Sequence, residues 1–202
     1  MKRNTLIQIT CLLLLAGGLN LRAASGTWTN DASGSWSGTA NWLNGVVADA
    51  SGSTADFSTI NLTANRTVTL DAAHTLTTLK FGDILPDSNW TLSGANTLTL
   101  AGTTPTINVL NQSTTISSVI AGTVGLTKAG LGSLTLGGAT DTFTGGLKHN
   151  AGTLTLDYNA SGSPSSTLVP SQALTLGGGA LNINGNAGTA TSQTFAGATF
   201  NA

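Results

Sequence analysis

Apolar and hydroxyl-bearing residues alternate along two short segments in the middle of the chain. Residues 133–136 read Ser-Leu-Thr-Leu and residues 153–156 read Thr-Leu-Thr-Leu, and a glycine precedes each segment. Because successive side chains of a strand point to opposite faces, the leucines share one face and the hydroxyl residues share the other. This alternation is typical of a half-buried β-strand.

The alternation recurs along the chain at a regular interval, since positions 116, 136, 156 and 176 are all aliphatic. A fixed period of roughly 20 residues is typical of a coiled stack of β-rungs. We therefore predict an all-β fold, a parallel β-helix (β-solenoid) with about 20-residue rungs, in which equivalent positions lie above one another. The predicted internal column consists of Ile116, Leu136, Leu156 and Leu176, and the predicted external row consists of Thr115, Thr135, Thr155 and Thr175.

Glycine and asparagine separate the predicted strands. Residues 137–138, 145–146 and 177–179 are glycines, and residues 150–152 read Asn-Ala-Gly. These residues adopt the positive φ angles of tight turns at little steric cost. After residue 25 no segment combines helical spacing with a cap and an apolar stripe, so the chain is predicted to be almost entirely β.

The N-terminus has the organisation of a secretory signal peptide. Residues 1–3 (Met-Lys-Arg) are basic at their second and third positions, residues 6–19 are largely apolar, and residues 23–25 (Ala-Ala-Ser) are small. The apolar run is shorter than the about 20 residues that a membrane span needs. We predict a signal peptide over residues 1–25, with cleavage after Ala23 or after Ser25. Cys11, the single cysteine, leaves with it, so the mature chain has no disulfide.

Charge adds little chemistry to this picture. Only 7% of the 202 residues are charged, and the formal net charge is −1. That balance excludes a basic nucleic-acid-binding surface and an acidic disordered tail. His74 and His149 stand alone in the sequence, and no metal-spaced pair or nucleotide-binding motif occurs, so we expect neither an enzyme nor a cofactor. The eight aspartates are dispersed among predicted turns: Asp31, Asp49, Asp56, Asp71, Asp83, Asp87, Asp141 and Asp157.

Residues 26–60 form a distinct opening segment that is rich in tryptophan. Trp28, Trp36 and Trp42 lie among glycine, serine and threonine residues. One interpretation is a cap that covers the open first rung of the stack. The alternative is a platform on which sugar rings stack. Residues 61–202 form the predicted solenoid, and residues 194–202 read as the start of a further rung, so we expect the natural chain to be longer.

Three segments resemble the autotransporter-associated β-strand repeat, which is also called the passenger-associated transport repeat. The matching segments are residues 125–136, 143–146 and 151–156. The resemblance implies a right-handed β-helix that is exported to the bacterial cell surface as the stalk of a passenger. His149 departs from the repeat, because a β-branched aliphatic residue is common there. It is either an irregular core position or points outward.

Two functions follow from these features. The first is a non-catalytic secreted or cell-surface structural passenger of autotransporter type, with an adhesive role. The second is a glycan-binding module that uses Trp28, Trp36 and Trp42. Ice binding by the threonine rows and cleavage of polysaccharides are less favoured alternatives.

The expected location follows from the signal peptide and the resemblance. We expect export through the inner membrane to the extracellular space or the outer-membrane surface. The expected partner is a cell-surface or extracellular polysaccharide. Contact with a membrane is expected only through an export system or a missing C-terminal part, and the oligomeric state stays open.

Overall fold

The computed structural model describes residues 24–201. Cys11, Ala23 and nearly all of the predicted signal peptide lie outside these residues. Within residues 24–201 the regular structure consists of eighteen strands and two short 3-10 helices, η1 (Thr39–Asn41) and η2 (Leu43–Gly45). The prediction of an all-β fold is confirmed.

The strands form three sheets, and all their pairings are parallel. The eight-stranded sheet contains β1 (Gly26–Thr27), β3 (Thr54–Phe57), β6 (Thr78–Phe81), β9 (Thr106–Val109), β12 (Leu126–Ala129), β14 (Leu147–His149), β16 (Ala173–Leu176) and β18 (Gly197–Phe200). The seven-stranded sheet contains β2 (Gly34–Ser35), β4 (Arg66–Thr69), β7 (Trp90–Ser93), β10 (Ser113–Ile116), β13 (Ser133–Gly137), β15 (Thr153–Asp157) and β17 (Ala180–Asn184). The three-stranded sheet contains β5 (His74–Leu76), β8 (Leu98–Leu100) and β11 (Ile120–Ala121).

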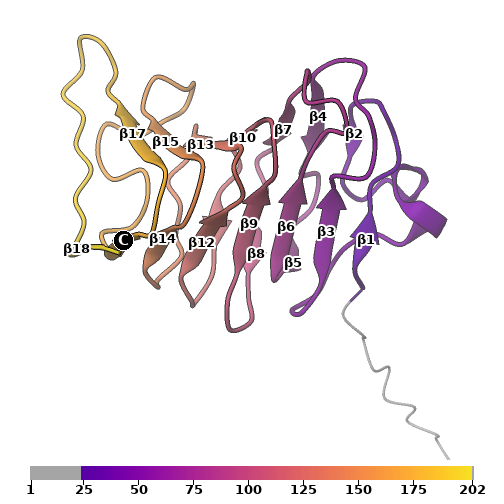
Figure 1. Ribbon diagram of the computed structural model, residues 1–202, viewed down its shortest axis with the longest axis horizontal. Helices are drawn as coiled ribbons and strands as arrows, with labels where there is room; N and C mark the ends of the chain where they lie inside the picture. Colours follow the sequence, from indigo (N-terminus) through magenta and orange to yellow (C-terminus); the bar gives the residue numbers. More distant parts are fainter. Residues whose placement is uncertain (1–23, 202) are drawn as a thin grey trace, which may run out of the picture.

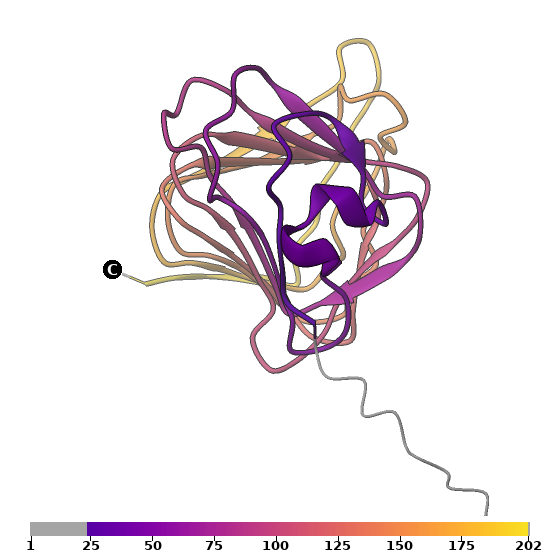
Figure 2. The same ribbon diagram turned by 90° about the vertical axis from the view of Figure 1, so that its right-hand side faces the viewer.

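The chain alternates between the eight-stranded and seven-stranded sheets, and in three central turns it also passes through the three-stranded sheet, so that it winds into a solenoid. Strands of successive turns lie side by side along the long axis (Figure 1), and the three sides enclose an interior that is visible from the end (Figure 2). The solenoid has about six turns with rungs of around 24 residues. The rungs are therefore longer on average than the sequence period predicts, because the loops between strands differ in length.

The core fills the interior of the coil. In β13 and β15 the leucines are buried and the threonines are half-buried on the outer face, as alternation requires. The buried apolar residues form one cluster that runs from Trp28 to Leu174. Each fully buried aliphatic side chain contributes about 1.5–3 kcal/mol, so the column is the main source of stability.

The register of the seven-stranded sheet corrects one member of the predicted column. Ile116 pairs with Leu136 and Leu136 pairs with Leu156, in agreement with the predicted interval. Leu156 then pairs with Ile183, which lies further along the chain than the predicted partner. Leu176 lies instead in β16 of the eight-stranded sheet, beside His149. The prediction for Leu176 was wrong because residues 158–172 form a long excursion between β15 and β16.

The two ends of the stack differ. At the N-terminal end, η1 and η2 lie across the opening of the coil (Figure 2). At the other end, β17 and β18 are edge strands, and Ile183 and Phe200 are 50% and 77% exposed. The described coil is therefore covered at one end and presents apolar residues at the other.

The assignment of faces is tested by a matched pair of substitutions in β15. Leu156→Asp places an unpaired charge in the core and is expected to lower the free energy of unfolding by more than about 3 kcal/mol. Thr155→Ser changes a side chain on the outer face and is expected to change it by less than about 0.5 kcal/mol. Equal denaturation midpoints for the two variants would contradict the assignment.

Candidate functional site

The three tryptophans of the opening segment lie in the core at the N-terminal end of the coil. Trp28, Trp36 and Trp42 are at most 2% exposed. The ring centroid of Trp42 lies 5.3 Å from that of Trp28 and 5.3 Å from that of Trp36. All three rings surround Phe57 at 5.4 Å. Edge-on and tilted contacts at these distances are favourable for aromatic pairs.

The indole N–H groups of this cluster are satisfied by main-chain carbonyls. Trp36 Nε1 donates to Ala48 O at 3.0 Å, and Trp42 Nε1 donates to Trp36 O at 2.6 Å. Trp28 Nε1 donates to Asn30 O at 2.6 Å. Because neither ring faces nor N–H groups are free, no ring of the three is available to stack on a sugar. The arrangement agrees with the cap and does not support the glycan platform.

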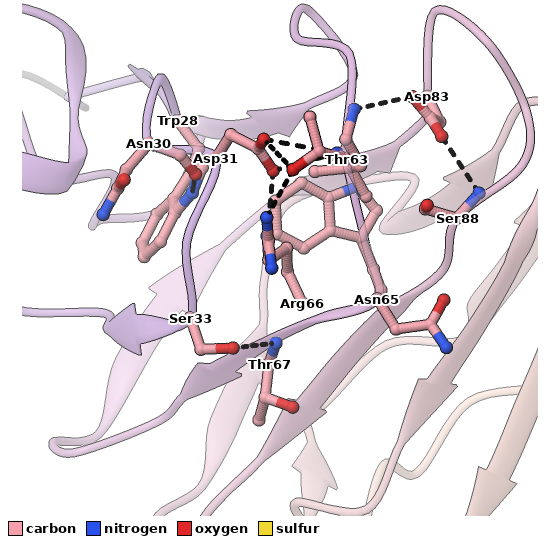
Figure 3. Close-up of polar contacts among 12 residues, drawn as sticks. Trp28, Asn30, Asp31, Ser33, Thr63, Asn65, Arg66, Thr67, Asp83 and Ser88 are labelled. Atoms are coloured by element: carbon pink, nitrogen blue, oxygen red, sulfur yellow. Dashed lines mark hydrogen bonds and ion pairs between the residues drawn. The ribbon is translucent and has the colours of Figure 1, made fainter.

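A second contact ties the opening segment to the first complete rung through Asp31. Arg66 Nε donates to Asp31 Oδ1 at 2.8 Å, and Thr63 Oγ1 donates to Asp31 Oδ2 at 2.7 Å. Figure 3 shows the carboxylate lying between these two side chains, with Ser33 accepting from the Thr67 N–H nearby. Hydrogen bonds from Arg66 and then from Thr63 lower the pKa of Asp31 to about 2. The carboxylate is therefore ionised at neutral pH.

A serine, a histidine and an aspartate meet on the other side of the cap. Ser37 Oγ lies 3.3 Å from His74 Nε2, and His74 Nδ1 lies 3.1 Å from Asp49 Oδ2. The ring of Trp36 stacks on the ring of His74, with centroids 5.4 Å apart. A hydroxyl, an imidazole and a carboxylate in this order are the components of the catalytic triad of serine hydrolases.

The surroundings of Ser37 lack the donors that such chemistry requires. The Ser37 N–H donates to Asp71 Oδ1 at 2.9 Å, and the Gly38 N–H donates to Ser35 O at 3.2 Å. Both main-chain donors beside the hydroxyl are thus occupied, whereas acyl transfer needs free donors for a developing oxyanion. The Asp71 carboxylate would also repel that negative charge. The cluster, which we call the Ser37 clasp (Ser37, Asp49, Asp71 and His74), is suited to hold the opening segment on the coil.

The carboxylates of this clasp are stabilised in their ionised form. Burial acts to raise the pKa of Asp49, but hydrogen bonds from the Thr75 N–H and from His74 outweigh it and leave the pKa below its usual value. Burial likewise opposes the hydrogen bonds of Ser37 at Asp71, and the net effect again lowers the pKa. Ser37 and Asp49 are far in the sequence from Asp71 and His74, and no spacing pattern indicates that the four residues meet.

The remaining titratable residues of the described chain do not form a further site. Within residues 24–201 no group of three or more His, Cys, Asp or Glu side chains is placed to hold a metal ion. No helix in that range is long and apolar enough to span a membrane. His149 does not join His74, because His74 lies in β5 of the three-stranded sheet and His149 lies in β14 of the eight-stranded sheet. His149 is fully buried inside the coil. An open hollow of about 180 Å³ lies beside β12 and β14, and Lys148 is the charged residue among those that line it.

Comparison with known proteins relates the chain to an autotransporter adhesin. It is 36% identical over 178 residues to a protein described as "Adhesin BmaC autotransporter" from Brucella suis biovar 1 (strain 1330). The match covers 81% of this chain, and the chain spans only 5% of the length of that relative. No family model matches the sequence, so the specific repeat family is not confirmed. No solved structure matches the chain.

The cap can be tested by truncating one of its rings. Trp36→Ala removes a fully buried ring and leaves a cavity, and we expect it to lower the free energy of unfolding by about 3–5 kcal/mol. Leu43→Ala is the control, because Leu43 lies in η2 and is 51% exposed. Its expected effect is within about 0.5 kcal/mol. Similar losses in the two variants would show that the buried rings do not close the coil.

The clasp can be distinguished from a catalytic triad by chemical labelling. A fluorophosphonate probe, which reacts with activated serines, is expected to leave the protein unlabelled at neutral pH because no oxyanion donors are free beside Ser37. Labelling that is lost in Ser37→Ala but kept in Ser35→Ala would establish an activated nucleophile and refute the structural role.

Proposed function

We propose that the chain is a non-catalytic structural passenger segment of an exported cell-surface protein of autotransporter type, and that it acts in adhesion. The observation that carries this proposal is the similarity to an autotransporter adhesin over most of the chain, combined with the solenoid fold. The name of that relative implies export to the bacterial surface, and we propose the same export for this chain.

The shape of the molecule supports a role as a spacer or stalk. Stacking of similar rungs produces an elongated body in which each rung contacts only its neighbours. The length of such a body grows with the number of rungs without any new type of contact. A segment of this kind can therefore hold an adhesive surface away from the cell.

The outer face of the seven-stranded sheet offers a surface for a neutral partner. Apart from Arg66, which pairs with Asp31, and Asp157 at the end of β15, the strands of this sheet carry no charged side chain. One row of five threonines is continuous across neighbouring strands: Thr67, Thr91, Thr115, Thr135 and Thr155. β-Branched side chains are stiff, so these hydroxyl groups are held in a regular array. Such an array suits a polysaccharide with repeated hydroxyl groups, which we propose as the partner.

The adhesive role is tested by displaying residues 24–201 on a bacterium that does not adhere to animal cells. We expect display to raise adherence to cultured cells above that of the display anchor alone. Periodate oxidation of the glycans on the cultured cells is expected to lower the gain, since the proposed partner is a polysaccharide.

Two controls accompany the adherence measurement. Antibody staining confirms equal surface levels, and Thr115→Lys with Thr135→Lys introduces charge into the threonine row without touching the core. Adherence equal to that of the anchor alone, at confirmed surface levels, would contradict the adhesive role. Unchanged adherence of the double variant would contradict only the proposed surface.

A further inference from the structure

Two basic side chains lie next to each other inside the coil, where the other strands place aliphatic residues. Lys128 in β12 pairs with His149 in β14, and His149 pairs with Leu176 in β16. On the opposite side Lys128 pairs with Ile107. The side chains of Lys128 and His149 are both 0% exposed. Buried lysine and histidine are rare unless each has a partner.

The ammonium group of Lys128 is fully satisfied by main-chain carbonyls. Its Nζ donates to Ala129 O at 3.0 Å, to Gly130 O at 2.8 Å and to Ala151 O at 2.9 Å. Three acceptors match the three N–H bonds of an ammonium ion. Burial lowers the pKa of Lys128 to about 8, which still leaves it protonated at neutral pH. A positive charge is therefore fixed inside this part of the coil.

His149 has no comparable support. Neither Nδ1 nor Nε2 has a hydrogen-bond partner among the described residues, although both atoms are buried. Burial, and then the charge of Lys128, lower the pKa of His149, while main-chain groups of Ala180 and Gly152 act in the opposite direction. The imidazole is therefore neutral at neutral pH, and a proton on it would add a second positive charge beside the first.

Within residues 24–201 no negative charge is placed to compensate that second charge. The neighbours of the pair in the eight-stranded sheet are Ile107 and Leu176, and β13 and β15 contribute buried leucines to the same core. On the third side of the coil the ionisable group is Asp141, whose carboxyl group accepts from the Ile120 N–H at 2.8 Å. Burial raises the pKa of Asp141 to about 8, so this carboxyl group is neutral at neutral pH as well.

We propose that His149 makes the coil sensitive to acid. The rungs from β14 to β18 stay closed while its imidazole is neutral, and its protonation opens them while the rungs next to the aromatic cap stay folded. In a stack held by contacts between neighbours, a group of adjacent rungs can open while distant rungs stay folded. Within residues 24–201, Ile183 and Phe200 are 50% and 77% exposed, whereas the three tryptophans of the opening segment are buried.

The direction of the effect follows from the two states of His149. In the opened rungs the imidazole regains a pKa near 6.5, whereas in the closed coil its pKa lies lower. The contribution of His149 to stability is therefore complete above about pH 6.5 and is lost as the pH falls toward the pKa of the closed state. Between pH 7.5 and 5.0 protonation of the open form favours opening by up to about 30-fold.

Asp141 acts in the opposite direction and must be separated from His149. Its pKa is raised in the closed coil from 3.8 to about 8, so its contribution to stability is complete below pH 3.8 and is lost progressively as the pH rises to about 8. The effect of His149 is therefore measured as the difference in opening between the wild-type protein and His149→Leu, which both retain Asp141. The same difference is measured again in an Asp141→Asn background, where the side-chain oxygen can still accept from the Ile120 N–H.

The experiment is amide hydrogen exchange of β14, β15 and β16 at pH 7.5 and 5.0, corrected for intrinsic exchange rates, with β7 and β10 as the internal reference. On going to pH 5.0, opening of these strands should increase up to about 30-fold more in the wild-type protein than in His149→Leu. Leucine suits the position, because it is apolar like the register neighbour Leu176 and position 149 lies in the aliphatic core. In the Asp141→Asn background, lowering the pH from 7.5 to 5.0 should itself increase the opening of β14, β15 and β16. Adding His149→Leu should abolish that increase.

An identical pH dependence in the wild type and in His149→Leu would overturn the proposal. If His149→Leu does not fold, the imidazole can be followed directly by NMR, since the chain contains only two histidines. The closed protein should show one imidazole that stays neutral below pH 6.5. Titration of the His149 imidazole near pH 6.5 without opening of β14 would equally overturn it.

Discussion

The structure depends on the parallel stacking of inward-facing aliphatic residues from one rung to the next. A single rung of this chain buries little on its own, because its strands are only two to five residues long. Stacking in register gives each internal strand two hydrogen-bonded neighbours and encloses Leu136 between Ile116 and Leu156. The same constraint makes the ends of the coil the weak points. The aromatic cap, the Asp31–Arg66 pair and the Ser37 clasp are three separate ways of securing one end.

The sequence pattern was sufficient to predict the class of fold. Alternation and a regular interval identified the solenoid and the buried and outer faces of β13 and β15. The same pattern failed at Leu176, because residues 173–176 repeat the alternation of the earlier strands but belong to a different sheet. Alternation specifies which side chains face inward, and the loops between strands decide which sheet a strand joins. Loop length therefore limits what periodicity alone can predict.

The cap and the buried basic pair could be predicted only in part. The density of tryptophan near the N-terminus indicated an unusual segment, and the structure shows that its rings face inward. The meeting of Ser37, His74 and Asp49 has no counterpart in sequence spacing, since long-range folding brings them together. Lys128 also gave no signal, because its partners are main-chain carbonyls of two successive turns. The sequence alone is compatible with His149 in the core or on the surface, and its burial beside Lys128 settles that it faces inward.

Residues of successive rungs are lateral neighbours, and the number of residues between such neighbours varies along the chain. Cross-linking with dibromobimane, which joins nearby thiols, tests it most directly in a Cys11→Ser background. The structure pairs Thr155 with Asn182 and places Thr175 in the other sheet. Cysteines at 155 and 182 should therefore cross-link, and cysteines at 155 and 175 should not. The reverse result would indicate a uniform step of 20 residues between rungs and would contradict the register that places Leu156 beside Ile183 in the core.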